Sequence, residues 1–299
     1  MSKLISLDQD RGPSRKRQER LAMILRYLVA VIAIAFALFP VLWVLSASVN
    51  PRGSLASQQL IPANASFENY QVLLGGDPRF PFPRWLFNSF YIATVTSILA
   101  VFITSLSAYA FSRFRFRQRR NLLLSMFLVQ VFPNILTMVA LFLLIQQLGF
   151  YIPFLGLNSH GGLILVYLGG VMGINVWLMK GFFDSIPRDI DESAMVDGAS
   201  HWQSFWLLIF PLVRPILVVV GILTFIGVYS DFLIARILLT SNSQLTVMVG
   251  LWIFISQQFS QNWGVFAAGG LMAALPIVII YLLLQDQIVG GLTQGAVKG

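Results

Sequence analysis

Six long apolar stretches alternate with polar segments along this chain of 299 residues. They cover residues 27–48, 86–111, 121–147, 161–183, 212–235 and 264–285. A helix needs about 20 apolar residues to cross a bilayer core of about 30 Å, and each stretch is long enough. The pattern therefore predicts an all-α polytopic membrane protein with six transmembrane helices.

One further apolar stretch, residues 245–255, lies before the last span. At about 11 residues it is too short to cross a bilayer as a helix. We interpret it as a re-entrant, interfacial or partner-packed segment within an external loop of residues 236–263.

Basic residues beside the apolar stretches predict the orientation of the chain. The net charge is +8, and two basic groups flank the first three spans. The first group is Lys3, Arg11, Arg15, Lys16, Arg17, Arg20 and Arg26, and the second is Arg113, Arg115, Arg117, Arg119 and Arg120. Such groups mark cytoplasmic segments. We therefore expect a cytoplasmic N-terminal segment (1–26), a cytoplasmic tail (286–299), a cytoplasmic loop (184–211) and external loops at 49–85 and 148–160.

The same placement of charge argues against nucleic acid as a partner, because the basic residues lie beside membrane spans. The first apolar run is also longer than the core of a cleavable signal peptide, which spans about 7 to 15 residues. An uncleaved signal anchor is the favoured interpretation.

Composition narrows the chemistry. The chain is 57% hydrophobic and 11% charged, has no cysteine, and has only His160 and His201 as histidines. Its mean hydropathy is +0.77. Disulfides and thiolate nucleophiles are excluded, and neither a metal site nor a catalytic pair of base and nucleophile is predicted. The few charges within spans weaken the alternative of an ion-coupled secondary transporter. Asp231, near the outer end of the fifth span, lines an external mouth or is a hydrated interfacial residue.

The cytoplasmic loop holds the most informative sequence, ESAMVDGASHWQSFWLLIFP at residues 192–211. We expect Pro187 to end the fourth span and Asp189 to cap a short helix over residues 190–196. Gly198 permits a turn, and a second helix follows Ser200. The loop presents two short helices to the cytoplasm, either for a partner or as an ordinary amphipathic interfacial pair.

This loop resembles the EAA motif found in permease subunits of binding-protein-dependent ABC importers. The resemblance rests on Glu192-Ser193-Ala194, then Gly198, then Leu208-Ile209-Phe210-Pro211. Ser193, Leu208 and Phe210 depart from the usual residues. In that family the motif is a coupling helix that docks into an ATPase subunit. The resemblance implies ATPase-coupling roles for Glu192, Ser193, Ala194, Asp197, Gly198 and Pro211.

A wider resemblance to G-type permeases of maltose and maltodextrin importers begins near residue 27. It is carried by residues 107–113, 151–158, 167–170, 273–276 and 291–299. It implies a permease core at 86–285 in a bacterial cytoplasmic (inner) membrane, working by alternating access. The implied partners are an F-type permease, homodimeric ATPase subunits that bind ATP-Mg, and an external or periplasmic sugar-binding protein. No cofactor is expected on this chain, and another sugar such as trehalose remains an alternative substrate.

The resemblance also assigns expected roles to residues outside the cytoplasmic loop. The tail residues Gln294, Gly295 and Lys298 are expected at the ATPase interface. Contacts to the sugar-binding protein are expected at Leu245, Gly250, Trp252 and Gln257. Polar residues of the spans are candidates for the translocation path, although helix-to-helix packing is the favoured explanation for each. These path candidates are Asn88, Asn134, Asn175 and Tyr229.

Overall fold

The computed structural model describes residues 13–51, 59–62, 64–256 and 261–296, and all regular secondary structure within them is helical. The helices of the first half are α1 (Pro13–Ser48), α2 (Glu68–Leu74), α3 (Phe82–Arg113), α4 (Arg119–Val131), α5 (Asn134–Tyr151) and α6 (His160–Asp184). The helices of the second half are α7 (Asp189–Val196), α8 (His201–Gln203), α9 (Phe210–Leu212), α10 (Arg214–Tyr229), α11 (Leu233–Leu238), α12 (Val247–Ser256) and α13 (Trp263–Ala296). The π-helical turn η4 (Ser204–Ile209) joins α8 to α9.

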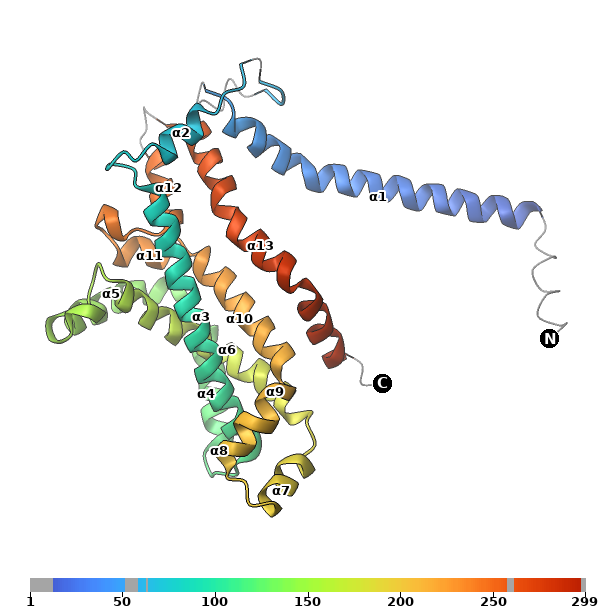
Figure 1. The fold of residues 1–299 in the computed structure, drawn as a ribbon, viewed down its shortest axis with the longest axis vertical. Helices are drawn as coiled ribbons and strands as arrows, with labels where there is room; N and C mark the ends of the chain where they lie inside the picture. Colours follow the sequence, from blue (N-terminus) through green and yellow to red (C-terminus); the bar gives the residue numbers. More distant parts are fainter. Residues whose placement is uncertain (1–12, 52–58, 63, 257–260, 297–299) are drawn as a thin grey trace.

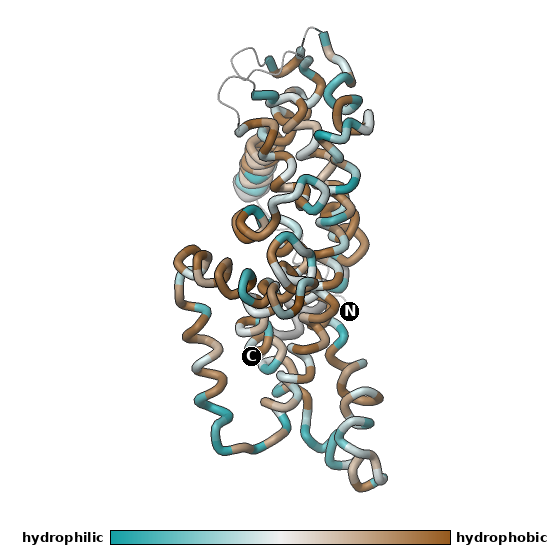
Figure 2. The backbone as a smooth tube through the Cα atoms, turned by 90° about the vertical axis from the view of Figure 1, so that its left-hand side faces the viewer, coloured by the Kyte–Doolittle hydropathy of each residue, from teal (hydrophilic) through white to brown (hydrophobic). Residues whose placement is uncertain are grey.

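Four helices within the described residues are long and apolar enough to cross a membrane, and the number rises to six if two bent pairs are each one span. The four are parts of α1, α3, α6 and α13. The bent pairs are α4 with α5, at 105°, and the segment His201–Leu212 with α10, at 77°. Hydrophobic positions follow the long helices in Figure 2.

Two of the six expected spans, residues 121–147 and 212–235, contain breaks in the helix. Pro133 separates α4 from α5, because proline lacks the backbone N–H that would continue the helix and disfavours helical geometry in the residue before it. The fifth apolar stretch ends as a helix at Tyr229 and resumes as the short α11. An apolar run predicts membrane residence, whereas local backbone chemistry decides where the helix breaks.

Helix α1 lies apart from the bundle over most of its length (Figure 1), and its apolar side chains are largely exposed. Only its C-terminal end is buried, beside α2 and α13. The side-chain amide of Asn69 donates to the carbonyls of Ser48 at 2.9 Å and Asn50 at 3.0 Å. The hydroxyl of Tyr70 donates to Ser48 Oγ at 2.8 Å. These bonds fix the end of α1 to the bundle.

The bundle centres on α3, α6 and α10, and its core falls into two main clusters. One lies at the end that carries α2 and α12 and includes Phe82, Trp85 and Tyr229. The other lies toward the end that carries α7 and α8 and includes Tyr109, Phe183 and Phe205. The second cluster therefore places the 184–211 loop against the ends of the long helices.

The apolar segment before α13 forms α12 and packs into the first cluster. Gly250 lies against the indole ring of Trp85, so closely that a Cβ atom there would overlap the ring. The indole Nε1 of Trp85 donates to the carbonyl of Asn242 at 2.7 Å. The backbone N–H of Val247 donates to Ser89 Oγ at 2.8 Å. Helix α12 is thus held to α3.

We expect Gly250→Ala to lower the free energy of unfolding by about 1–3 kcal/mol, because the added methyl group must displace the fully buried Trp85 ring. Thermal unfolding in mild detergent measures the change. Gly270→Ala is the matched control, since a Cβ there meets no atom within 4 Å. Equal stability of the two variants would contradict this account.

Candidate functional site

The loop between α6 and α10 folds as two short helices joined by a tight turn. Helix α7 ends before Gly198, whose φ of +89° lies in the left-handed region that favours glycine. Ser200 then caps α8 through a capping box, in which Gln203 N–H donates to Ser200 Oγ and Ser200 N–H donates to Gln203 Oε1. The predicted turn at Gly198 and the helix after Ser200 are confirmed.

The predicted cap at the start of α7 was wrong. Arg188 occupies the cap position, without a side-chain cap bond, and Asp189 is the first helical residue. Asp189, Asp191 and Glu192 all lie in the first turn, where carboxylates interact favourably with the helix dipole. Charge rather than a side-chain cap therefore supports this terminus.

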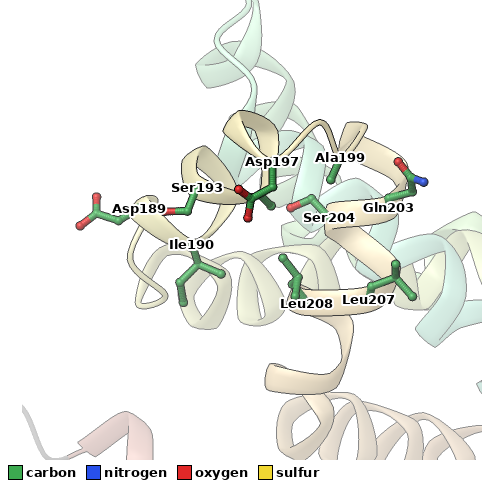
Figure 3. Close-up of a pocket in the computed structure, with 10 residues that line it drawn as sticks. Asp189, Ile190, Ser193, Asp197, Ala199, Gln203, Ser204, Leu207 and Leu208 are labelled. Carbon is green, nitrogen blue, oxygen red and sulfur yellow. The ribbon is translucent and has the colours of Figure 1, made fainter.

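A pocket of about 550 Å³ opens between α7 and the segment of α8 and η4 (Figure 3). Asp189 lies toward one end of it and Leu207 toward the other, with Ile190 and Leu208 between them. The remaining lining residues are Ser193, Ala194, Asp197, Ala199, Gln203 and Ser204. The two helices thus form a concave surface. Its apolar side chains include Ile190, Leu207 and Leu208, and Asp189 and Asp197 contribute carboxylates to its lining.

A buried ion pair fixes this helix pair to the end of α3. Arg113 Nε lies 2.7 Å from Asp191 Oδ2, and each side chain is only 6% exposed. The other carboxylate oxygen, Asp191 Oδ1, accepts from Ser204 Oγ at 3.0 Å and from the Tyr109 hydroxyl at 3.4 Å. One carboxylate of α7 therefore links α3, α7 and η4.

Further bonds join the end of α3 to the end of α6 and to the segment that leads into α7. Arg113 donates to the carbonyl of Ile186 at 3.2 Å, and Arg188 donates to the carbonyl of Ser112 at 3.1 Å. Ser112 Oγ donates to Asp184 Oδ1 at 2.7 Å. The ends of α3 and α6 and the start of α7 consequently form one hydrogen-bonded unit.

The residues expected to couple to an ATPase lie mainly on the outside of this unit. Glu192, Ser193, Asp197, Gly198 and Pro211 are exposed. Ala194 is 7% exposed and belongs to the interior. Glu192, Ser193 and Asp197 are therefore accessible on the surface of the loop, whereas Ala194 packs inside it.

Three residues of the unit were missed as site residues from sequence. Arg113 was counted only as an orientation signal, and neither Tyr109 nor Asp191 was selected. Tyr109 and Arg113 are four residues apart and so share one face of α3. That spacing was a usable signal, but the partner carboxylate comes from a segment about 80 residues away, and only the tertiary structure identifies it.

Three of the four predicted path residues join parts of the fold together. The Asn88 amide donates to the carbonyls of Ser243 and Leu245, at 3.0 and 2.9 Å. Asn175 donates to Thr224 Oγ1 at 3.1 Å, and the Tyr229 hydroxyl donates to the carbonyl of Ala273 at 2.9 Å. These contacts fit the packing explanation. The side chain of Asn134 lies outside the described residues.

The residues predicted to contact a binding protein differ in exposure. Leu245 and Gly250 are buried, so in this conformation they support α12 rather than present a surface. Trp252 is 41% exposed, with its ring 5.4 Å from that of Phe232. Gln257 and the tail residue Lys298 lie outside the described residues. Gln294 and Gly295 fall within the last turns of α13, where side chains are not described.

Asp231, half-buried after the end of α10, is held by hydrogen bonds within the chain. Its Oδ1 accepts from the Tyr167 hydroxyl at 2.7 Å and from the N–H groups of Ile234 and Ala235, each at 3.1 Å. It therefore caps α11 and links the break after α10 to α6.

Comparison with known proteins identifies the class. Residues 100–290 match the family described as "Binding-protein-dependent transport system inner membrane component". One chain of the crystal structure of a bacterial ABC transporter involved in the import of the acidic polysaccharide alginate shares the fold with a TM-score of 0.72. It is 25% identical, and the match covers 90% of this chain and 97% of that one.

Two relatives carry the same name, "Maltose/maltodextrin transport system permease protein MalG". The protein of Vibrio vulnificus (strain YJ016) is 44% identical over 276 residues, which cover 89% of this chain and 92% of that protein. The protein of Escherichia coli (strain K12) is 40% identical over 293 residues, which cover 95% of this chain and 98% of that protein.

The helical membrane fold and the family match thus define a permease rather than a catalytic subunit. The chain belongs to the family of inner membrane components of binding-protein-dependent transport systems. It is a multi-pass inner-membrane permease of an ABC importer, and its family implies partner ATPase subunits and a binding protein.

We expect Asp191→Ala to lower the free energy of unfolding by about 3–5 kcal/mol, because it leaves the buried Arg113 without its counter-ion. Thermal unfolding in detergent measures the loss. Asp189→Ala, an exposed acid of the same helix turn, is the control and should change little. The double variant Arg113→Met with Asp191→Leu should recover most of the loss. A single variant as stable as the control would contradict the role of the pair.

Proposed function

We propose that this permease moves maltose and maltodextrins, pairing with an F-type permease and two identical ATPase subunits and receiving sugar from an external binding protein. The observation that carries the substrate class is 40% to 44% identity, over nearly the whole chain, to permeases named for maltose and maltodextrin. Another sugar such as trehalose is the second candidate within the same role. An ion-coupled secondary transporter has no support from the family.

The proposed orientation places both termini and the loop between α6 and α10 in the cytoplasm. Support comes from the basic residues that lie next to that loop at the ends of α3 and α4. Arg115, Arg117 and Arg120 are exposed there. Clustered arginines near span ends favour the cytoplasmic side. The segment with α2 and α12 then faces outward, where a sugar-binding protein docks and Trp252 is available for contact.

The proposed coupling begins at α7. Docking to an ATPase would use the exposed Glu192, Ser193 and Asp197, and closure of the two ATPases would displace the helix pair. The buried contact of Asp191 with Arg113 joins α7 to α3. Movement of α7 would therefore move α3, which runs the length of the bundle. The bundle would then tilt between its inward-open and outward-open states. The tail with Gln294, Gly295 and Lys298 is proposed to add a second ATPase contact.

Purification in mild detergent tests the assembly. A tagged chain, expressed with its native neighbours, should recover an ATPase and a second permease in stable complex. Sugar-loaded binding protein should stimulate the ATPase activity of that complex, and maltose and trehalose compared at equal concentration separate the two substrate candidates. Transport by the isolated chain without any ATPase would contradict the proposal.

We expect Glu192→Lys and Gly198→Trp to insert normally into the membrane and to lose ATPase binding or ATP-driven sugar uptake. The first reverses a charge on the docking face, and the second places a bulky side chain at a positive φ. Uptake by reconstituted complexes is the measurement. Glu19→Lys, at an exposed position of α1 away from both proposed docking faces, is the charge-matched control. Normal uptake in both loop variants would count against the coupling role.

A further inference from the structure

The turn between α3 and α4 carries a dense group of cations. Residues 113–120 read RFRFRQRR, which is five arginines in eight positions with no acid among them. The coupling loop uses the first of them, because Arg113 forms the buried ion pair with α7. Three others, Arg115, Arg117 and Arg120, have exposed side chains. These three exposed arginines have no role in the contacts that hold the loop.

The carboxylates at this end of α3 and α6 are already paired. Asp191 pairs with Arg113, and Asp184 pairs with Lys180. Among the described residues, none of the three exposed arginines forms an ion pair. Helix α4 has no acidic residue in its first turn and no side-chain cap, so the positive end of its dipole adds to the same charge. The turn therefore presents positive charge that the described part of the chain does not neutralise.

Helix α4 has one packed face and one exposed face. On the packed face, the indole Nε1 of Trp177 donates to the carbonyl of Leu123 at 3.0 Å, and Leu123 is buried. On the exposed face, Leu124 and Leu128 are 43% and 67% exposed. A spacing of four residues places Arg120, Leu124 and Leu128 along one side of the helix. That side therefore begins with a cation and continues with apolar surface.

Two phenylalanines alternate with the arginines and hold the turn in place. The ring of Phe114 lies edge-on to His201 of α8, with ring centroids 4.9 Å apart. The ring of Phe116 lies 5.5 Å from that of Phe111, near the end of α3. Both rings are also partly exposed, at 38% and 40%. The turn is thus fixed to α3 and α8 and places exposed aromatic rings beside its cations.

A phospholipid has the same order of groups as this side of α4. Its phosphate carries negative charge, and its acyl chains follow directly. The guanidinium group of arginine donates two parallel N–H groups to phosphate oxygens. Clusters of basic residues next to a span attract anionic lipids. Arg120 followed by Leu124 and Leu128 therefore matches a lipid whose headgroup lies at the turn and whose chains lie along α4.

We propose that the turn between α3 and α4 binds an anionic phospholipid, with Arg115, Arg117 and Arg120 at its phosphate and Leu124 and Leu128 along its acyl chains. The proposed orientation of the permease puts this lipid in the cytoplasmic leaflet. A helix of a partner subunit is the competing occupant. Such a helix would have to bring counter-ions for three arginines as well as apolar surface, because a buried cation without a counter-ion is costly.

The lipid site lies next to the coupling contact. Arg113 belongs to the same turn and holds α7 through Asp191. A headgroup bound at Arg115 and Arg117 therefore ties the end of α3 to the bilayer surface where α7 joins it. Because a ligand stabilises the folded form that it binds, anionic lipid is expected to raise the thermal stability of the complex through this turn.

A photoreactive residue tests what lies against α4. Benzoylphenylalanine replaces the exposed Leu124 in complete complexes purified in mild detergent. The complexes are titrated with phosphatidylglycerol, or with phosphatidylcholine of the same acyl chains, and irradiated. Mass spectrometry of this chain then measures the covalent lipid adduct at each concentration. We expect half-saturation at a lower concentration of phosphatidylglycerol than of phosphatidylcholine, because the two headgroups differ in net charge.

Arginine variants in the same background test the headgroup contact. Arg117→Gln with Arg120→Gln should weaken phosphatidylglycerol binding by about thirtyfold, since each arginine near an anionic surface contributes about fivefold. The lysine pair at the same two positions keeps the charge and should keep most of the affinity. Arg84→Gln with Arg236→Gln is the control, because it removes the same charge from exposed positions at the other ends of α3 and α10. Phosphatidylglycerol should raise the unfolding temperature of the control but not of the glutamine pair at the turn.

Three outcomes would overturn the lipid site. One is equal labelling by the two lipids, and another is an equal loss of affinity in the turn variant and the control. The third is a covalent product with a partner subunit in place of the lipid adduct, which would assign this face to a protein interface. The assay contains neither sugar nor ATP, so a failure of the proposed transport function leaves its result unchanged.

Discussion

The buried ion pair of Arg113 and Asp191 is the contact on which the arrangement of the coupling loop depends. Removing two charges from water costs several kcal/mol per ion, and mutual pairing with further hydrogen bonds is what offsets it. Ser204 and Tyr109 supply those bonds, so a displaced α7 would expose unmatched polar groups in the interior. Helix α7 is therefore joined to the long α3 by a buried ion pair and its supporting hydrogen bonds.

The far end of the bundle is built from a different kind of contact. Amides of Asn69 and Asn88 donate to backbone carbonyls at the end of α1 and in the segment before α12, and Gly250 lets the Trp85 ring lie directly on α12. Backbone carbonyls in a largely apolar setting need such donors. The segments around α2 and α12 are thus held to the bundle, while Trp252 remains exposed. Both ends of the bundle are therefore held by buried polar contacts.

Between these ends, two interrupted stretches set the geometry of the membrane region. Pro133 ends one helix, and Asp231 supports the restart of another by accepting its first N–H groups. Breaks of this kind cost hydrogen bonds within a span, and they persist where side chains restore them. Some polar residues within the spans join helices, as Asn175 joins Thr224 and Tyr229 joins Ala273, and Asp231 with Tyr167 both joins helices and borders a cavity.

The sequence by itself determined the class of protein, because apolar stretches of membrane length, clustered arginines and the spacing from Glu192 to Gly198 are local patterns. It also predicted the turn at Gly198 and the helix after Ser200, since a flexible residue and a capping side chain act within a few positions. It did not reveal the breaks within two apolar stretches or the roles of Asn88, Asp191 and Asp231. Those depend on partners from distant segments, such as Arg113 for Asp191 and Tyr167 for Asp231. Only the tertiary structure decided these pairings, because burial makes an unpaired polar group costly and packing selects which group satisfies it.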